Sequence, residues 1–537
     1  MLAPARAPAC RLRFFPWNAP SRCESSGAFS LRSAHDERYE FYADWAERIA
    51  RGQWTDFHAF YGQPLYAYLA GAVFALAGFQ PFWLGLLQAC LDAITSVLIF
   101  EIALLVFGEG SPRRGVVVAL LAVAGWIFYL PAAAYCGLLI PAAFPVTTWW
   151  FVVWWLLRRR VAARGMEWCA VALLIGFSAL ISAATLLLLA LFLPALFWRP
   201  RPRPWAILGV VAGVTLGTAP AWAHNAFVAR DPVFISAHGG VNFWIGNNPE
   251  ANGYPKIPSD LPSEQAELLA GSIRVAEVAA GQRLPHSSVS EYWSAKARNY
   301  IGSHFSEWLI LEGIKIKNFW SNFAYDDLST ITPLRDAGIL PPGIRFGLLA
   351  ALGLPGALFA WRNRRARWIL AAITLQMLAL LPVFINERYR LPAAPGLLLL
   401  DAFFLTELWF HFSRAHWRPA LLAGAALLAA TLFVSFPPRD PALLSIDDFK
   451  AGRRELLAYD FGHAERRLRL AAAVAVPPAQ VTSAIVQIFA EVAREKWQAG
   501  DQDAARAIVA AALHIAPENA PLQRLSFSLK TAQPQTP

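Results

Sequence analysis

Charged residues are scarce in this sequence, and cysteines are scarcer still. Of its 537 residues, 16% are charged and 56% are hydrophobic, so the chain is far more apolar than a soluble globular protein of this length. Only 5 residues are cysteine; Cys10 and Cys23 lie near the start, and the others lie in or beside apolar segments without metal-ligand spacing. The sequence therefore predicts neither a disulfide framework nor a zinc site.

Long apolar runs recur from about residue 84 to residue 436. A run of about 18 residues or more can cross a bilayer core of roughly 30 Å, and it must be helical because lipid satisfies no backbone hydrogen bonds. The sequence predicts an all-α fold, a polytopic membrane helix bundle with about ten crossings. The shorter apolar segment 64–79 is predicted to lie at the interface. The predicted spans are 84–107, 115–133, 138–157, two short helices within 167–197, 205–224, 343–361, 368–385, 392–410 and 419–436.

The arginines indicate how the bundle is oriented. A net charge of +10 would suggest a nucleic-acid ligand in a soluble protein, but here the arginines gather in short clusters between the apolar runs. All of these clusters fall on one side of the predicted bundle, and only Arg388 and Arg390 lie in the short loops opposite. By the positive-inside rule the clusters are cytoplasmic, so we expect a multi-pass cell (inner) membrane protein and no nucleic-acid partner. The clusters are 113–114, 158–164, 199–203, 362–367 and 414–418.

This topology divides the chain into three parts. Residues 1–33 are atypical: they must lie outside, yet they contain no apolar run long enough for a spanning helix or a signal peptide, as a wrongly assigned start or an upstream frameshift would explain. Residues 34–436 form the predicted transmembrane domain. It includes a first external loop, 34–83, and a large external loop, 225–342, which mixes turn residues with amphipathic patterns and should fold as a partly helical subdomain.

The third part, residues 437–537, is predicted to be a small helical domain on the external side. Two of its segments resemble each other, with Ala464 and Pro477 aligning with Ala504 and Pro517. The pattern is similar to a loose tetratricopeptide-type helical repeat. Because helical repeats offer extended surfaces, this tail is a candidate site for a protein partner or an acceptor.

The first motif with a possible chemical role is HDERY at residues 35–39. The helical pattern YEFYADWAERIARGQW and then QPLY at 63–66 follow it. This arrangement resembles the GT-C polytopic glycosyltransferases, specifically the dolichyl-phosphate-mannose–protein mannosyltransferase-like group (glycosyltransferase family 39). The resemblance covers roughly residues 35–436, through short and moderately specific motifs, and it implies a GT-C-like bundle.

The resemblance implies a catalytic role for the acids of the first external loop. The family's proposed base falls on Asp36, with Glu37 beside it. A carboxylate there would take the proton from an acceptor hydroxyl or amine while that group attacks the anomeric carbon of a lipid-phosphate sugar. The alternative is that both acids merely cap the helix that starts near Arg38, as Asp commonly does.

A second motif, NERYRLP at 386–392, matches the entry to a late helix in the same family. The resemblance implies that Arg388, Tyr389 and Arg390 bind the donor phosphate, and guanidinium groups do bind phosphate oxygens bidentately. The alternative is ordinary anchoring of a helix end at the interface. A third stretch, 307–320, implies in the same way that Lys315 neutralises the donor phosphate; the alternative is a solvated lysine on an amphipathic helix.

The sequence also departs from the family. Residues 134–148 carry no carboxylate, Ser182 to Ala184 replace an Arg-Pro found in relatives, and Ala324 stands at a position often acidic, with Asp326 and Asp327 nearby. Only Asp36 and Glu37 are well placed for a divalent metal, which needs more oxygen ligands. The sequence therefore predicts no metal site, and no cofactor is assigned.

The resulting hypothesis is a membrane glycosyltransferase that moves a sugar from a polyprenyl-phosphate donor to a protein, lipid or glycan acceptor at the external face. Two rivals remain. The missing acids and the missing first helix favour a non-catalytic scaffold or a degenerate transferase. A transporter for a lipid-linked glycan would need ionisable residues within the spans, where Asp92, Glu101, Asp401 and Glu407 lie.

Overall fold

In the computed structural model, every regular element of the described chain is a helix, as predicted for an all-α protein. An isolated bridge between Tyr129 and Ile344 is the one β-type contact among the described residues. The predicted stretch 1–33 and Asp36 lie outside them. The described residues are 37–159, 164–197, 204–262, 265–323, 325, 331, 342–436, 445, 448–449, 451–453, 455–456, 460–474 and 478–531.

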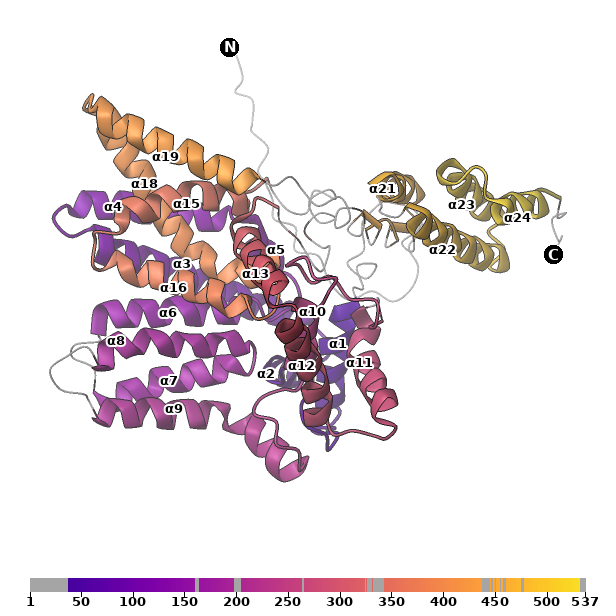
Figure 1. The fold of residues 1–537 in the computed structure, drawn as a ribbon, viewed down its shortest axis with the longest axis horizontal. Helices are drawn as coiled ribbons and strands as arrows, with labels where there is room; N and C mark the ends of the chain where they lie inside the picture. Colours follow the sequence, from indigo (N-terminus) through magenta and orange to yellow (C-terminus); the bar gives the residue numbers. More distant parts are fainter. Residues whose placement is uncertain are drawn as a thin grey trace, which may run out of the picture.

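Most of these helices form one bundle, drawn horizontally in Figure 1. Four helical runs are long and apolar enough to cross a membrane: Pro81–Phe107, Pro204–Val228, Glu387–Ser413 and Trp417–Ser435. The run Glu387–Ser413 is the central one, because 78% of its apolar window is buried, against 17% for Trp417–Ser435. The bundle consists of α3 (Pro81–Phe107), α4 (Pro112–Ile127), α5 (Leu130–Cys136), α6 (Ala143–Arg159), α7 (Gly165–Ala179), η1 (Ala183–Leu191), α8 (Phe192–Phe197), α9 (Pro204–Ala223), η2 (His224–Val228), α15 (Phe346–Ala360), α16 (Ala366–Leu380), α17 (Glu387–Arg390), η3 (Leu391–Ala393), α18 (Ala394–Ser413) and α19 (Trp417–Ser435).

The apolar runs mark these helices closely, with three corrections at their ends. The span predicted from 138 begins at Ala143, and the span predicted to reach 385 ends at Leu380. The run 167–197 is a pair of short helical segments, as predicted. The predicted span 115–133 is wrong at its end: α4 stops at Ile127, and the seven-residue helix α5 follows. The cause is the extended backbone at Tyr129, whose neighbour Leu130 donates its N–H to the carbonyl of Ile344 at 3.0 Å.

Glycines bring two of the bundle helices into close contact. Gly209, Gly213 and Gly217 recur every four residues along α9, so they share the face that packs on α7. A Cβ at Gly213 would lie 2.2 Å from the carbonyl oxygen of Cys169, so no residue with a side chain fits at this position. Small residues at this spacing are typical of helices that associate within membranes.

The loops that follow α3, α15 and α18 lie at one end of the bundle, at the left in Figure 1. Three of the basic clusters, 113–114, 362–367 and 414–418, lie in or beside these loops. Arg365 donates to the carbonyl of Leu105 at 2.7 Å, which joins the loop after α15 to the end of α3. Arg114 at the start of α4 pairs with Glu407 near the end of α18. The structure therefore separates this basic end from the end that carries α5 and α17.

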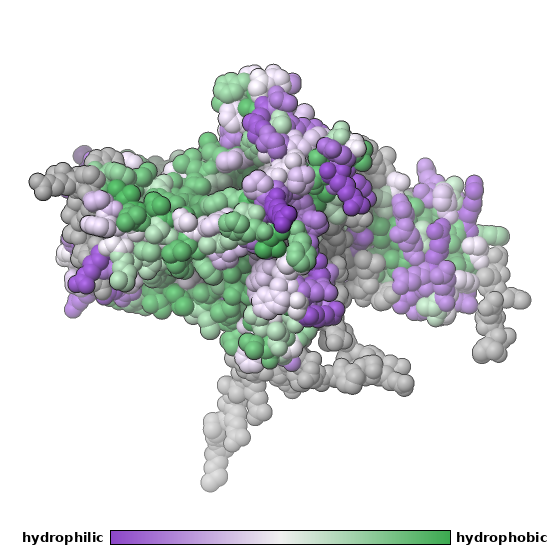
Figure 2. Space-filling view, turned by 90° about the horizontal axis from the view of Figure 1, so that it is seen from below, coloured by the Kyte–Doolittle hydropathy of each residue, from purple (hydrophilic) through white to green (hydrophobic). Residues whose placement is uncertain are grey.

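The outer surface of the bundle is apolar. Figure 2 shows a broad hydrophobic area over the bundle, with hydrophilic residues concentrated toward its two ends. Large side chains such as Leu121, Leu208 and Leu428 point outward from different helices. A continuous apolar surface of this kind is costly in water and suits a lipid environment.

A second group of helices lies across the end of the bundle opposite the basic loops (Figure 1). It consists of the paired helices of the first loop, α1 (Glu37–Ala50) and α2 (Leu65–Ala77), and of the helices from the long loop, α10 (Gly239–Gly246), α11 (Gln265–Ala280), α12 (His286–Ser303) and α13 (Phe305–Trp320). Trp244 and Trp293 are buried in its core. The predicted turn-and-helix subdomain within 225–342 is thus present in the described part of that loop.

The C-terminal region is also helical where it is described. Its helices are α21 (Phe461–Val474), α22 (Pro478–Gln498), α23 (Gln502–Ile515) and α24 (Ala520–Thr531). They pack around a small core of their own that includes Ile485, Phe489 and Ile508. This agrees with a helical tail, and the tetratricopeptide assignment stays a prediction.

Candidate functional site

The second predicted motif forms the short helix α17, and two of its charges are completely buried. Asn386 caps this helix by accepting the N–H of Tyr389 at 2.7 Å. Glu387 and Arg390, one turn apart, form an ion pair with side chains 0% and 1% exposed. Tyr129 donates its hydroxyl to Glu387 at 3.2 Å, so the carboxylate has partners on two sides.

Arg390 binds the end of α13 to this helix. Its Nη1 donates to the carbonyl of Ser321 at 2.8 Å, and its Nη2 donates to that of Phe323 at 3.2 Å. The guanidinium also lies 4.0 Å from the centre of the Phe346 ring. Ser321 caps the C-terminal end of α13, where carbonyls lack partners within the helix and need other donors. Phosphate binding by Arg390 stays a prediction, but in this structure protein acceptors already occupy both Nη groups.

Arg388 and Tyr389 lie nearer the surface. Both are half-buried, so Arg388 is the arginine of the pair that reaches the boundary of the molecule. Its guanidinium lies 5.0 Å from the Tyr389 ring, which stacks on Phe384 at 5.8 Å. Of the predicted phosphate ligands, Arg388 is therefore the one best placed to contact a ligand from outside.

Lys315 is not the solvated lysine of the alternative interpretation, because its side chain is 0% exposed. Its ammonium donates to Asn247 at 3.0 Å, to Glu312 at 2.6 Å and to the carbonyl of Leu381 at 2.7 Å. Burial lowers its pKa, while the bond to Glu312 acts in the opposite direction. Through these bonds Lys315 joins α13 to the end of α10 and to the segment after α16. Its role at the donor phosphate stays a prediction.

The first predicted motif opens α1. Glu37 is the first residue of that helix, and nothing is described of its side chain or of Asp36. The start of α1 packs on α2, where the rings of Tyr42 and Tyr66 meet edge to face at 5.2 Å. The Tyr66 hydroxyl in turn donates to Gln88 of α3 at 3.4 Å.

The short helix α5 connects these two regions. At its C-terminal end, the Gln88 amide donates to the carbonyls of Cys136 and Leu138 at 3.0 and 2.7 Å. At its other end stands Tyr129, which holds Glu387 of α17. A helix of seven residues spans only about 10 Å. One end of α5 thus contacts the α17 motif directly through Tyr129, and its other end is linked to Tyr42 of α1 only through side chains of α3 and α2.

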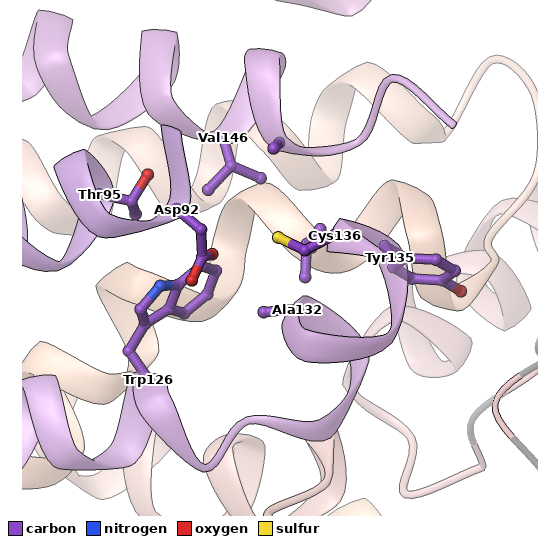
Figure 3. A pocket seen from close by; sticks show the side chains of 9 residues that line it. Asp92, Thr95, Trp126, Ala132, Tyr135, Cys136 and Val146 are labelled. Atoms are coloured by element: carbon purple, nitrogen blue, oxygen red, sulfur yellow. The ribbon is translucent and has the colours of Figure 1, made fainter. Parts of the chain in front are cut away.

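A small pocket of about 10 Å³ lies beside α5, and Asp92 of α3 lines it. Figure 3 shows the Asp92 carboxylate facing the indole of Trp126 and the thiol of Cys136. Leu391, the residue after Arg390, also lines this pocket. The sequence singled out Asp92 as an ionisable residue within a span, but it gave no sign of Cys136 or Trp126 as its neighbours.

The four acids within the spans differ in their partners. Glu101 pairs with Arg158 at 2.9 Å, and Glu407 pairs with Arg114 at the basic end. Asp401, in contrast, is 5% exposed, and its Oδ1 has no hydrogen-bond partner. Ion pairing therefore accounts for Glu101 and Glu407, and leaves Asp92 and Asp401 as the candidates for a role within the bundle.

Histidines from three elements contact residues 51–64, the segment of the first external loop that joins α1 to α2. His224 contacts Thr55 at 2.7 Å, and His286 contacts the carbonyl of Ala59 at 2.5 Å. His238 contacts the carbonyl of Tyr61 at 2.9 Å. The loop is thus attached to η2, α12 and the start of α10.

This attachment should weaken in acid through His238. Burial lowers the pKa of His238 below its ordinary value of 6.5, although the bond to Tyr61 opposes the shift. The unfolded chain then binds more protons than the folded one, so stability is full above about 6.5 and falls as the pH drops below it. We expect the melting temperature of the protein in lipid nanodiscs to fall between pH 7.5 and pH 5.

His238→Asn is the matched variant, because its amide can still donate to the carbonyl of Tyr61 but does not titrate. It should show a shallower fall of melting temperature with pH than the unaltered protein. The same slope in both proteins would assign the acid sensitivity to other groups.

Comparison with protein-family models, with curated protein sequences and with solved structures found no match to this chain. Within the described residues, no group of three or more His, Cys, Asp or Glu side chains is arranged to hold a metal ion. Asp36, Ala324, Asp326 and Asp327 are not described. In the part of the chain that the structure describes, all regular elements are helices, four helical runs are able to cross a membrane, and a helical layer lies across one end of their bundle.

Proposed function

We propose that this chain is a GT-C-like, multi-pass membrane glycosyltransferase that acts at the external face. A sugar would pass from a polyprenyl-phosphate donor to an acceptor hydroxyl or amine. The acceptor atom attacks the anomeric carbon, the bond from that carbon to phosphate breaks, and polyprenyl phosphate leaves. Asp36, with Glu37 beside it, takes the acceptor's proton.

One observation supports this proposal: contacts link one end of α5 to α17 and the other end, through α3 and α2, to α1. The resemblance assigns donor binding to α17 and acceptor activation to the residues at the start of α1. Gln88 holds the end nearer α1, and Tyr129 holds the end at α17. A proton acceptor and a phosphate site must lie within reach of one substrate. About 10 Å of helix between the two attachments is consistent with that requirement.

The charge distribution supports placing the proton acceptor and the phosphate site on the same, external side of the membrane. The described arginine-rich loops, which follow α3, α15 and α18, lie at the other end of the bundle, and the positive-inside rule predicts that this end faces the cytoplasm. Arg388 is thus an exception to the gathering of arginines on the cytoplasmic side. It lies at the external boundary, where a lipid-linked phosphate would be found. We assign Arg388 and Tyr389 to the donor phosphate, with Lys315 and Arg390 shaping the site from inside the fold.

A transfer assay tests this function. The protein in nanodiscs is given polyprenyl-phosphate hexose or pentose with labelled sugar, together with an envelope extract of the source cells as acceptor. We expect label to leave the lipid and enter the acceptor, with release of polyprenyl phosphate. No consumption of any donor would contradict the proposal and favour the scaffold.

A transporter of a lipid-linked glycan is the second candidate, because Asp92 and Asp401 lie in the helices of the bundle without ion pairs among the described residues. Proteoliposomes separate the two functions. A transporter would move the labelled donor between leaflets and leave its sugar attached, whereas a transferase would consume it.

A further inference from the structure

A second and larger pocket, of about 130 Å³, lies in the outer helical layer next to the segment between α1 and α2. α1 supplies Trp45 and Arg48, and the loop supplies Trp54 and Asp56. Tyr68 of α2 and His286 at the start of α12 complete the wall. Apart from His286, the lining residues lie between positions 45 and 68, and four of them belong to the pattern YEFYADWAERIARGQW. That pattern predicts a helix but gives no sign of a pocket.

The loop that forms one wall is held in a strained conformation. Phe57 has a φ of +63°, which is unfavourable for a residue with a large side chain, and it is 69% exposed. Thr55 and Asp56 each accept a backbone N–H two residues further on, at 3.0 and 3.1 Å. Strain of this kind persists only where the surrounding structure imposes it, and it is concentrated at functional sites.

The contacts from η2, α12 and α10 supply that constraint. His224 also stacks on Phe60 with ring centres 4.2 Å apart, and His286 contacts the Tyr61 ring at 5.2 Å. The loop is therefore fixed before any ligand arrives. A preformed site loses little conformational freedom on binding.

The side chains at the pocket combine flat aromatic surfaces with polar groups of both signs. Trp54 is 65% exposed, and Trp45 packs against Tyr68 with ring centres 6.4 Å apart. Arg48 is exposed, and no hydrogen bond or ion pair engages its guanidinium among the described residues. Asp56 provides the opposite charge nearby.

This combination selects among ligand classes. A quaternary ammonium would suit the aromatic rings but would be repelled by Arg48. A phosphate would suit Arg48 but would be repelled by Asp56. A sugar ring is neutral, stacks its C–H face on an aromatic ring, and offers hydroxyl groups to both a guanidinium and a carboxylate.

We propose that this pocket binds a saccharide, with Trp54 as the stacking surface and Arg48 and Asp56 as hydrogen-bonding partners. It is a different place from the α5 site, because residues 37 and 48 are separated by about 16 Å of helix. A glycan that reached both places would have to be an oligosaccharide. The pocket would hold its sugar whether the chain is a transferase or a scaffold, so the proposal does not rest on the transfer reaction.

Ligand-observed saturation-transfer NMR on the whole protein tests this directly. The protein is placed in nanodiscs, since a maltoside detergent would itself compete. The probes are the methyl pyranosides of glucose, galactose, mannose and glucuronic acid, with choline as the competing class. We expect at least one pyranoside to receive saturation, and Trp54→Ala to weaken its binding about tenfold.

Trp361→Ala is the matched control. Trp361 is similarly exposed, at 61%, but it lies in the loop after α15 at the basic end. It should leave saccharide binding unchanged, and Arg48→Gln should weaken it. Equal binding by Trp54→Ala, or saturation of none of the pyranosides, would overturn the proposal, as would choline binding that depends on Trp54. The melting temperatures of the variants show whether each remains folded.

Discussion

Replacing Arg390 with methionine is expected to lower the free energy of unfolding by about 3–5 kcal/mol, because it leaves a buried carboxylate without its countercharge. Glu387 is 0% exposed and cannot recover a solvent partner. The change also removes the donors for the carbonyls of Ser321 and Phe323 in the segment that follows α13. Denaturant unfolding in a mild non-ionic detergent, followed by far-UV circular dichroism, measures the loss.

Two further variants separate this role from ligand binding. Arg388→Met removes the neighbouring guanidinium at a half-buried position, so stability should change by only about 0.5 kcal/mol. Glu387→Leu combined with Arg390→Met removes both buried charges and should recover part of the stability. If Arg390→Met unfolds no more easily than Arg388→Met, the buried pair does not hold α13 in place.

Helix positions could be predicted from the sequence because apolar length and prolines determine them locally. The run 84–107 became α3 almost unchanged, whereas the end of α4 could not be placed. That end depends on Tyr129 pairing with Ile344, more than two hundred residues later. No local pattern contains this contact, and α5 exists because of it.

The candidate site shows the same division between local pattern and tertiary contact. The sequence reveals that Lys315 and Arg390 are charged, but it cannot reveal whether water or protein satisfies that charge. For Lys315, the acceptors include Asn247, which lies much earlier in the sequence, and the carbonyl of Leu381, which lies much later. A motif of basic residues therefore predicts that positive charges gather at the external end of the bundle. It does not predict which of these residues is exposed to a ligand and which is bound by protein acceptors.

Asp36→Asn is expected to reduce sugar transfer by about 100-fold or more, because an amide cannot accept the acceptor's proton. The residue immediately precedes the first residue of α1, so a capping role is the competing explanation. Asparagine caps helices about as well as aspartate, and the substitution therefore removes the base while keeping the cap. The initial rate of label transfer from the polyprenyl-phosphate donor gives the measurement.

Asp44→Asn is the matched control for this experiment, because Asp44 is an exposed acid two turns further along the same helix. It should transfer sugar at the unaltered rate. Asp36→Ala completes the set: a cap would cost about 0.5–2 kcal/mol of stability with transfer retained, whereas a base would abolish transfer. Full activity of Asp36→Asn would remove Asp36 from the mechanism and require that another group accept the proton, while leaving the transferase function itself in place.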